Sequence, residues 1–211
     1  MEVILDFDFK LDKQQVIHTL KSYCETITVE DINSLYKKLL PNLYECVQPA
    51  AMFTISEKNT DFTFEVIKDY KYIVYCLITI GDKISEKVNE FFSYAKMKEG
   101  MVLDAMATSY MFEISSQLFN HIHTKAEELS LGLSYRISPG DGEIPLWYQK
   151  NILDKLDSKN FFDIYVNEDF MLTSLRSMAY IYGADKNKPL SNIDHDCIRC
   201  KNKDQCSMRK K

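Results

Sequence analysis

The chain has 211 residues, of which 45% are hydrophobic and 27% are charged, a composition typical of a globular protein with a sizeable core. Its formal net charge of −5, without a stripe of basic and aromatic residues, argues against nucleic acid as a partner. The longest apolar run, residues 72–80, is too short to cross a bilayer, and the acidic N-terminus lacks the layout of a signal peptide. We therefore expect a cytoplasmic protein with no membrane partner, whose six cysteines are thiols or metal ligands.

The first part of the chain predicts an extended segment followed by two helices. Residues 1–9 alternate apolar and acidic side chains, which indicates an edge strand or an extended arm. Apolar residues at helical spacing predict helices over residues 11–24 and 29–47. Thr28 is placed to cap the second helix, and Pro41 is expected to bend or split it.

The middle of the chain predicts strands and then two helices. Residues 51–55 and 62–67 favour two strands around a polar turn, and residues 72–80, largely β-branched and aromatic, favour a central strand. Helices are predicted over residues 83–96 and 99–129. The long helix should turn one apolar stripe inward, formed by Val102, Met106, Tyr110, Ile114, Leu118 and Ile122.

The last part of the folded region predicts short elements. We expect a strand over residues 133–137, a helix over 146–156, a short strand or turn over 161–166, and a hairpin of residues 171–175 and 178–182. Strands and helices are mixed without strict alternation, so the predicted class is α+β. Its sheet should be mixed, mainly antiparallel and packed with helices, with a Cys-rich C-terminal tail appended.

The composition changes after residue 183, where a polar stretch leads into the cysteines. This change predicts a main domain over residues 1–183 and a linker with a Cys-rich tail over residues 184–211. Cys197 and Cys200 are separated by two residues, so their thiolates can share one metal ion, and Cys206 supplies a third ligand.

The fourth metal ligand is left open by the sequence. His195 or one of Cys24, Cys46 and Cys76 would have to provide it, although those three cysteines also suit the core as small apolar side chains. The spacing of the tail cysteines resembles part of the ligand loops of some [4Fe–4S] proteins, which favours an iron–sulfur cluster over zinc. Free or redox-active thiols are the remaining interpretation.

A turn rich in glycine and proline stands between the predicted strand at 133–137 and the helix after it. It begins with Arg136 and continues through Pro139, Gly140 and Gly142, residues that fix or permit tight backbone conformations. Backbone N–H groups beside an arginine can hold a carboxylate or another anion. The alternative is a plain connecting turn with one surface arginine.

Two sequence blocks resemble a known family. The first is Arg136-x-Ser138-Pro139-Gly140-x-Gly142-x-x-Pro145-Leu146-x-x-Gln149. It resembles the R-x-(S/A)-P-G-Y turn of the activation domain of vitamin B12-dependent methionine synthase, in its free-standing bacterial form. The second block, at residues 168–183, resembles the second motif of that family, and the likeness covers roughly residues 72–183.

The resemblance implies an accessory module that binds S-adenosylmethionine and assists the reductive methylation of cobalamin held by a partner, a corrinoid-binding methionine synthase, with an electron donor. Arg136 would engage the carboxylate of the ligand, and Tyr182 would contact the ligand. The turn backbone would lie along the adenosine, through Ile137, Ser138, Pro139 and Gly140.

The chain also departs from the family pattern. Asp141 stands where the family usually has tyrosine, and Ser174 replaces a proline. Asp141 can pair with a sulfonium or ammonium group of the ligand, or it can be a turn residue without a ligand. Two alternatives therefore stay open: an iron–sulfur redox protein that delivers electrons to a corrinoid protein, and a ligand-free binding module of the same fold.

Overall fold

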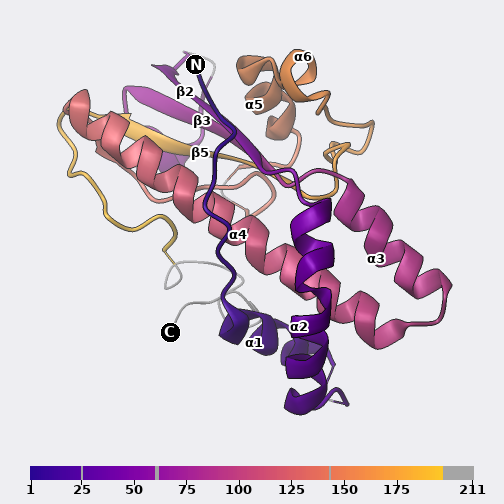
Figure 1. Cartoon of the computed structure of the whole chain (residues 1–211). Helices are drawn as coiled ribbons and strands as arrows, with labels where there is room; N and C mark the ends of the chain where they lie inside the picture. The colour runs from indigo at the N-terminus through magenta and orange to yellow at the C-terminus, as the bar shows by residue number, and fades with distance from the viewer. Residues whose placement is uncertain (25, 60–61, 143, 197–211) are drawn as a thin grey trace.

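The computed structural model describes residues 1–24, 26–59, 62–142 and 144–196, and it shows an α+β fold, as predicted. One antiparallel sheet of five strands has the order β1-β2-β3-β5-β4 (Figure 1). The strands are β1 (Glu2–Ile4), β2 (Ala50–Glu57), β3 (Tyr72–Thr79), β4 (Gly132–Leu133) and β5 (Ser177–Asp185). The short β1 is the predicted edge strand.

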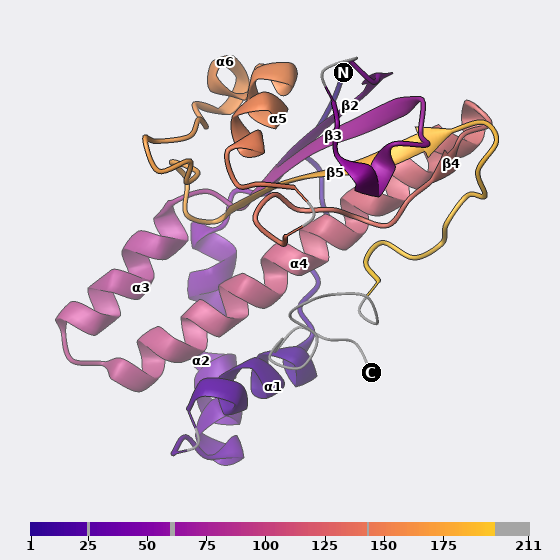
Figure 2. The same cartoon turned by 180° about the vertical axis from the view of Figure 1, so that it is seen from behind.

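Helices cover both faces of this sheet. They are α1 (Lys13–Tyr23), α2 (Val29–Cys46), α3 (Lys83–Ser93), α4 (Met97–Glu128), α5 (Tyr148–Leu156) and α6 (Ser158–Phe162). The long α4 runs along one face, while α5 and α6 lie on the other (Figures 1 and 2). The helices α1, α2 and α3 pack around the end of α4 that extends beyond the sheet. No helix in the described parts of the chain is both long and apolar enough to traverse a bilayer.

The central strand β3 explains why the sheet needs cover on both sides. Val74, Cys76 and Ile78 belong to the core shared with α4, which we call the upper core. Ile73, Tyr75 and Leu77 alternate with them and belong to the core shared with α5, which we call the lower core. Because both faces of β3 are buried, its sequence is a continuous apolar run, and the predicted central strand is confirmed.

The starts of α1 and α2 follow the expected capping chemistry. The Asp12 carboxylate accepts hydrogen bonds from two N–H groups of α1, and the Thr28 hydroxyl accepts from the N–H of Asp31 at 3.0 Å. The predicted split at Pro41 is wrong, because α2 is one helix from Val29 to Cys46. Pro41 and Lys37, the residue one turn before it, are exposed, so water can satisfy the carbonyl that loses its donor.

Three short predicted elements differ from the structure. The predicted strand 62–67 is wrong, since its end forms a 3-10 helix, Glu65–Ile67, and its aromatic residues pack into the lower core instead of a sheet. The predicted hairpin at 171–175 is wrong, because β5 pairs with β3 and β4 and has no free edge. The predicted strand or turn at 161–166 begins with the end of α6, and only Val166 forms a bridge.

The predicted end of the main domain, residue 183, falls inside strand β5. β5 runs to Asp185, two residues beyond the predicted boundary at 183. We call residues 186–196, which follow β5, the strap. In Figures 1 and 2 the strap leaves the sheet in yellow and returns alongside α4.

Candidate functional site

The glycine-rich turn has the predicted conformation but a different use of its N–H groups. Gly140 and Gly142 have φ angles of 92° and 91°, which other residues adopt only with strain. The N–H of Gly140 donates to Ile144 O at 2.8 Å, and that of Asp141 donates to Ser138 O at 3.2 Å. Since both groups are bonded within the turn, they do not form the predicted anion-binding backbone.

Arg136 is buried beside the sheet, so the alternative of a surface arginine is wrong. Ile137 bridges to β5 and belongs to the lower core, which places Arg136 on the opposite, α4 side. The Arg136 side chain is 9% exposed, and its Nη1 donates to Ser115 Oγ on α4 at 2.6 Å. Its Cζ lies 5.2 Å from the ring centroid of Tyr180 and 5.9 Å from that of Phe112, within cation–π range.

A carboxylate from the strap already sits on this guanidinium. Asp194 Oδ2 lies 3.4 Å from Arg136 Nη1, and Tyr182 donates its hydroxyl to Asp194 Oδ1 at 2.5 Å. The backbone N–H of Arg136 also donates to Asp194 O at 2.7 Å. Arg136 and Tyr182, which sequence reasoning selected separately, therefore meet around one carboxylate.

The electrostatics of the site favour a bound anion. Burial lowers the pKa of Arg136, but the charge of Asp194 and the tyrosines beside it raise that pKa, and the net direction is upward. Burial raises the pKa of Tyr182 well above its usual value, so its hydroxyl stays protonated and able to donate. Within the described ranges, Arg136 Nε is buried without a hydrogen-bond partner.

The sheet register explains how the tyrosines arrive at this point. Val74 on β3 pairs with Tyr182, and Cys76 pairs with Tyr180, so both tyrosines share the face that packs on α4. The Tyr180 hydroxyl lies 3.0 Å from Ser115 Oγ, which also accepts from Arg136. A polar network therefore crosses the upper core from β5 to α4.

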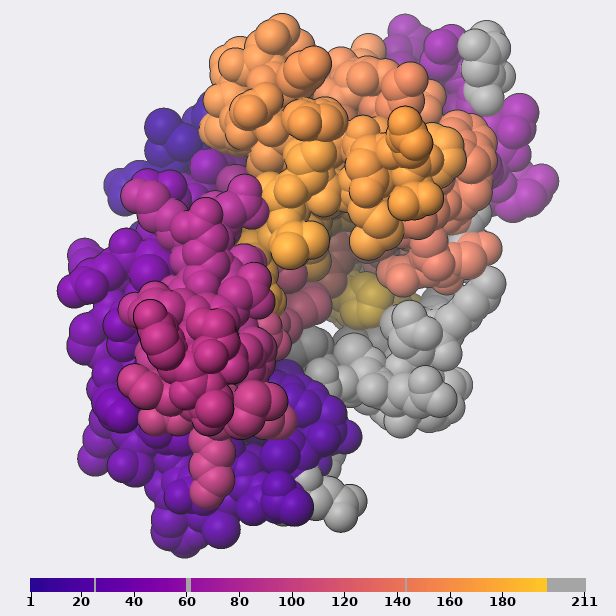
Figure 3. Space-filling view, turned by 90° about the vertical axis from the view of Figure 1, so that its right-hand side faces the viewer, coloured from indigo at the N-terminus to yellow at the C-terminus, as the bar shows by residue number. Residues whose placement is uncertain are grey.

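A second arginine contacts the same side of α4. Arg176, just before β5, donates from Nη1 to Thr108 Oγ1 at 3.0 Å and from Nη2 to Asp104. Positions 104, 108, 112 and 115 are three or four residues apart, so they form one stripe of α4. Figure 3 shows a hollow between the magenta α3 side and the orange segment that leads into β5, with part of α4 at its floor.

Sequence reasoning missed Asp194, Ser115 and this arginine. The available signal was the row of polar residues at helical spacing on α4, beside the apolar stripe that the structure confirms as buried. Asp194 carried no such signal, because its partner lies far away in the sequence.

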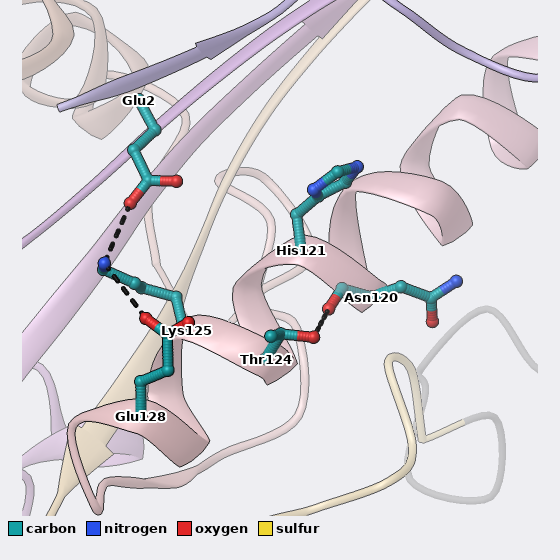
Figure 4. Close-up of a pocket in the computed structure, with 6 residues that line it drawn as sticks. All are labelled: Glu2, Asn120, His121, Thr124, Lys125 and Glu128. Carbon is teal, nitrogen blue, oxygen red and sulfur yellow. Dashed lines mark hydrogen bonds and ion pairs between the residues drawn. The ribbon is translucent and has the colours of Figure 1, made fainter.

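A separate surface pocket of about 340 Å³ lies between β1 and the C-terminal part of α4 (Figure 4). Lys125 bridges Glu2 at 3.5 Å and Glu128 at 3.2 Å across it. His121 lines this pocket, whereas His123 Nε2 lies 2.8 Å from Asn192 Oδ1 on the strap. The two histidines therefore face different segments, and this pocket shares no residue with the Arg136 site.

The predicted metal ligands Cys197, Cys200 and Cys206 lie outside the described residues. The fourth candidate, His195, follows Asp194 on the strap and is half-buried, and burial and Arg136 lower its pKa. In the part of the chain that the structure describes, no three His, Cys, Asp or Glu side chains gather as a metal site. Three cysteines there are free and lie apart, in α2, in β3 and after α1: Cys46, Cys76 and Cys24. The metal site therefore stays a prediction from spacing.

Comparison with known proteins supports the fold. The sequence matches no protein-family model and no curated protein. Among solved structures, it is similar to a crystal structure of the MetH reactivation domain bound to AdoHcy, with a TM-score of 0.62 and 10% identity. The alignment covers 90% of this chain and 80% of that one. The chain thus has the fold of a methionine synthase reactivation domain.

Proposed function

We propose that this chain binds S-adenosylmethionine and serves as an accessory module in the reactivation of a corrinoid-dependent methionine synthase. One observation carries the proposal: a buried arginine and a tyrosine hydroxyl converge on a carboxylate beside the Ser-Pro-Gly turn. The similar domain of known structure holds AdoHcy, which has the same amino-acid end. Two blocks of sequence led to the same class of ligand independently of the fold.

The chemistry of the site suits the amino-acid end of this ligand. Arg136 has a planar fork that can pair with both oxygens of a carboxylate, and its Nε is available for such a bond. Tyr182 adds a neutral donor, which in the structure bonds the other oxygen of the Asp194 carboxylate. Asp141 is exposed on the turn, where its charge can face a sulfonium or ammonium group. When bound, S-adenosylmethionine would supply a methyl group on a positively charged sulfur.

The partner in this proposal is a corrinoid-binding methionine synthase, which supplies the cobalamin, together with an electron donor. Large apolar side chains are exposed between the turn and β5, a pattern that favours a protein partner. They include Trp147 at 45%, Phe170 at 38%, Met171 at 52% and Leu175 at 73% exposure.

Calorimetric titration with S-adenosylmethionine tests the proposal. Replacing Arg136 by Gln removes the charged fork, and we expect the affinity to fall on the order of 100-fold, since hydrogen bonds to charged groups contribute about 1.5–3 kcal/mol. Replacing Arg136 by Lys keeps the charge but loses the fork, so an intermediate loss of about tenfold is expected. Lys150→Gln, on an exposed position of α5, is the matched control and should bind as the wild type does.

Far-UV circular dichroism should first confirm that each variant is folded. Absence of heat at millimolar S-adenosylmethionine, or unchanged affinity in Arg136→Gln, would contradict the proposed function.

A further inference from the structure

The strap places a carboxylate where the proposed ligand would place its own. Asp194 uses both of its carboxylate oxygens, one toward Arg136 and one toward Tyr182. A second carboxylate at the same guanidinium would bring two negative charges within a few ångströms of each other, which is strongly unfavourable in a buried site. Asp194 and an external carboxylate are therefore competitors for one position.

The strap is attached to the domain by contacts near its two ends and by Leu190 between them, which is partly buried against the upper core. Near β5, it passes directly over Gly132, where an added Cβ would lie 1.9 Å from Lys188 O and 2.6 Å from Pro189 O. Near Asp194, the side chain of Asn192 lies 2.8 Å from His123 Nε2. The described contacts place the strap over α4 and β4, with Leu190 partly buried against the upper core and no strap residue fully buried.

Burial separates the strap from the strand that precedes it. Seven residues of β5 are buried, whereas every residue of the strap is exposed or only partly buried. A segment with little buried apolar surface opens at a lower free energy than a core strand does. The strap can therefore leave its position while the sheet and α4 stay folded.

We propose that the strap is an internal competitor of the ligand: Asp194 occupies Arg136 and Tyr182 in the ligand-free protein, and a carboxylate-bearing ligand displaces it. This inference rests on the proposed function for the identity of the ligand, S-adenosylmethionine. It adds that binding requires the strap to open, so any partner that holds the strap away increases the affinity for the ligand.

Two variants release the strap by different routes. Asp194→Asn removes the competing charge but keeps the size of the side chain. Gly132→Ala forces the strap away from β4 through its backbone and leaves Arg136, Tyr182 and Asp194 unchanged. Asp6→Asn, at an exposed position, removes the same charge elsewhere and is the matched control.

Two measurements follow the competition. Calorimetry gives the affinity for S-adenosylmethionine, and we expect both variants to bind about tenfold tighter than the wild type and the control, because one charge-assisted contact no longer competes. Hydrogen exchange at the backbone N–H of Arg136, which donates to Asp194 O, reports whether the strap is in place. Saturating ligand should increase this exchange in the wild type.

Equal or weaker binding by both variants would show that the strap does not oppose the ligand, and it would overturn the proposal. Protection of the Arg136 N–H that persists in the ligand-bound wild type would overturn it as well. Because the two variants act at different places, misfolding of one leaves the other as the test.

If the proposed function is wrong, the binding results differ from those that would overturn the internal competitor. If neither S-adenosylmethionine nor S-adenosylhomocysteine binds any form, free methionine serves as the carboxylate probe. Tighter binding of methionine to Asp194→Asn than to the wild type would support the internal competitor and reject the proposed ligand. If methionine also fails to bind both variants while the Arg136 N–H exchanges freely, the internal competitor is rejected too.

Discussion

The two arginines that contact α4 differ in where their carboxylate partners come from. Arg176 pairs with Asp104, which belongs to α4 itself, so the two charges approach each other whenever the helix is packed. Arg136 pairs with Asp194, which belongs to the peripheral strap. The first pair fits a structural contact, and the second fits a site whose occupant can be exchanged. If Arg136 binds a ligand as proposed, the origin of its partner, rather than the presence of an ion pair, distinguishes it from Arg176.

The largest expected effect is on stability when each arginine is removed in turn. Arg136→Met leaves the Asp194 carboxylate and a partly buried network without their cation, and we expect a loss of about 3 kcal/mol in the free energy of unfolding. Arg176→Met breaks a pair in which Asp104 is 41% exposed, so about 1 kcal/mol is expected. Urea denaturation of both variants measures the difference. Equal losses would erase the distinction between the two arginines.

Alkaline pH should lower the stability of the protein through the buried tyrosines of the Arg136 site. Burial raises the pKa of Tyr182, so the folded state holds its proton more tightly than the unfolded state does. The resulting stability is fully present below the unfolded pKa of about 10 and is lost as the pH rises above that value. One such group contributes a slope of about 1.4 kcal/mol per pH unit.

Urea denaturation between pH 9 and pH 11 measures this slope. Tyr182→Phe should reduce the slope by the contribution of one proton, about 1.4 kcal/mol per pH unit. Tyr94→Phe, at a residue that is 69% exposed, is the control and should leave the slope unchanged. The same slope in both variants would contradict the assignment of the buried hydroxyl.

A smaller effect is expected from the turn that follows Arg136. Gly140 has a φ of 92°, and an added Cβ would lie 3.3 Å from Leu146 Cδ1, so the cost of Gly140→Ala comes mainly from the backbone. We expect a loss of about 1 kcal/mol in the free energy of unfolding. Binding of S-adenosylmethionine should weaken as well, because the turn positions Arg136, while the contact of Arg176 with α4 stays intact. Wild-type affinity in a destabilised Gly140→Ala variant would show that the turn does not position Arg136 for binding.

Local chemistry made much of the fold predictable from the sequence. The Thr28 cap, the apolar run of β3 and the inward stripe of α4 each depend on residues close together in the chain. The prediction for residues 62–67 failed because the apolar residues there pack into the lower core without forming a strand. In residues 171–175, Leu172 packs against that core, whereas Met171 and Leu175 are exposed. Periodicity shows that a residue is buried, and it does not show which surface buries it.

Only some residues of the candidate site could be predicted from the sequence. Arg136 and Tyr182 were found through their motifs, and the structure brings them to one carboxylate. Asp194 could not be found, because its relation to Arg136 arises when the strap returns across the sheet edge, a contact that no local pattern encodes. The N–H groups of Gly140 and Asp141 are not available to an anion, since the turn bonds them to its own carbonyls.

The smallest effect on the Arg136 site is expected from the tail cysteines. The spacing of Cys197 and Cys200 predicts a metal site, with an iron–sulfur cluster favoured over zinc. Protein purified without oxygen should then contain iron and sulfide, and replacing both cysteines by Ser should remove them. Because Asp194 contacts Arg136 and Tyr182 directly, we expect the double variant to keep wild-type affinity for S-adenosylmethionine. A colourless protein with one zinc ion would show that the cysteines form a structural zinc site instead of an iron–sulfur cluster. A protein without metal would refute the metal site, and a large loss of affinity in the double variant would show that the tail acts on the strap.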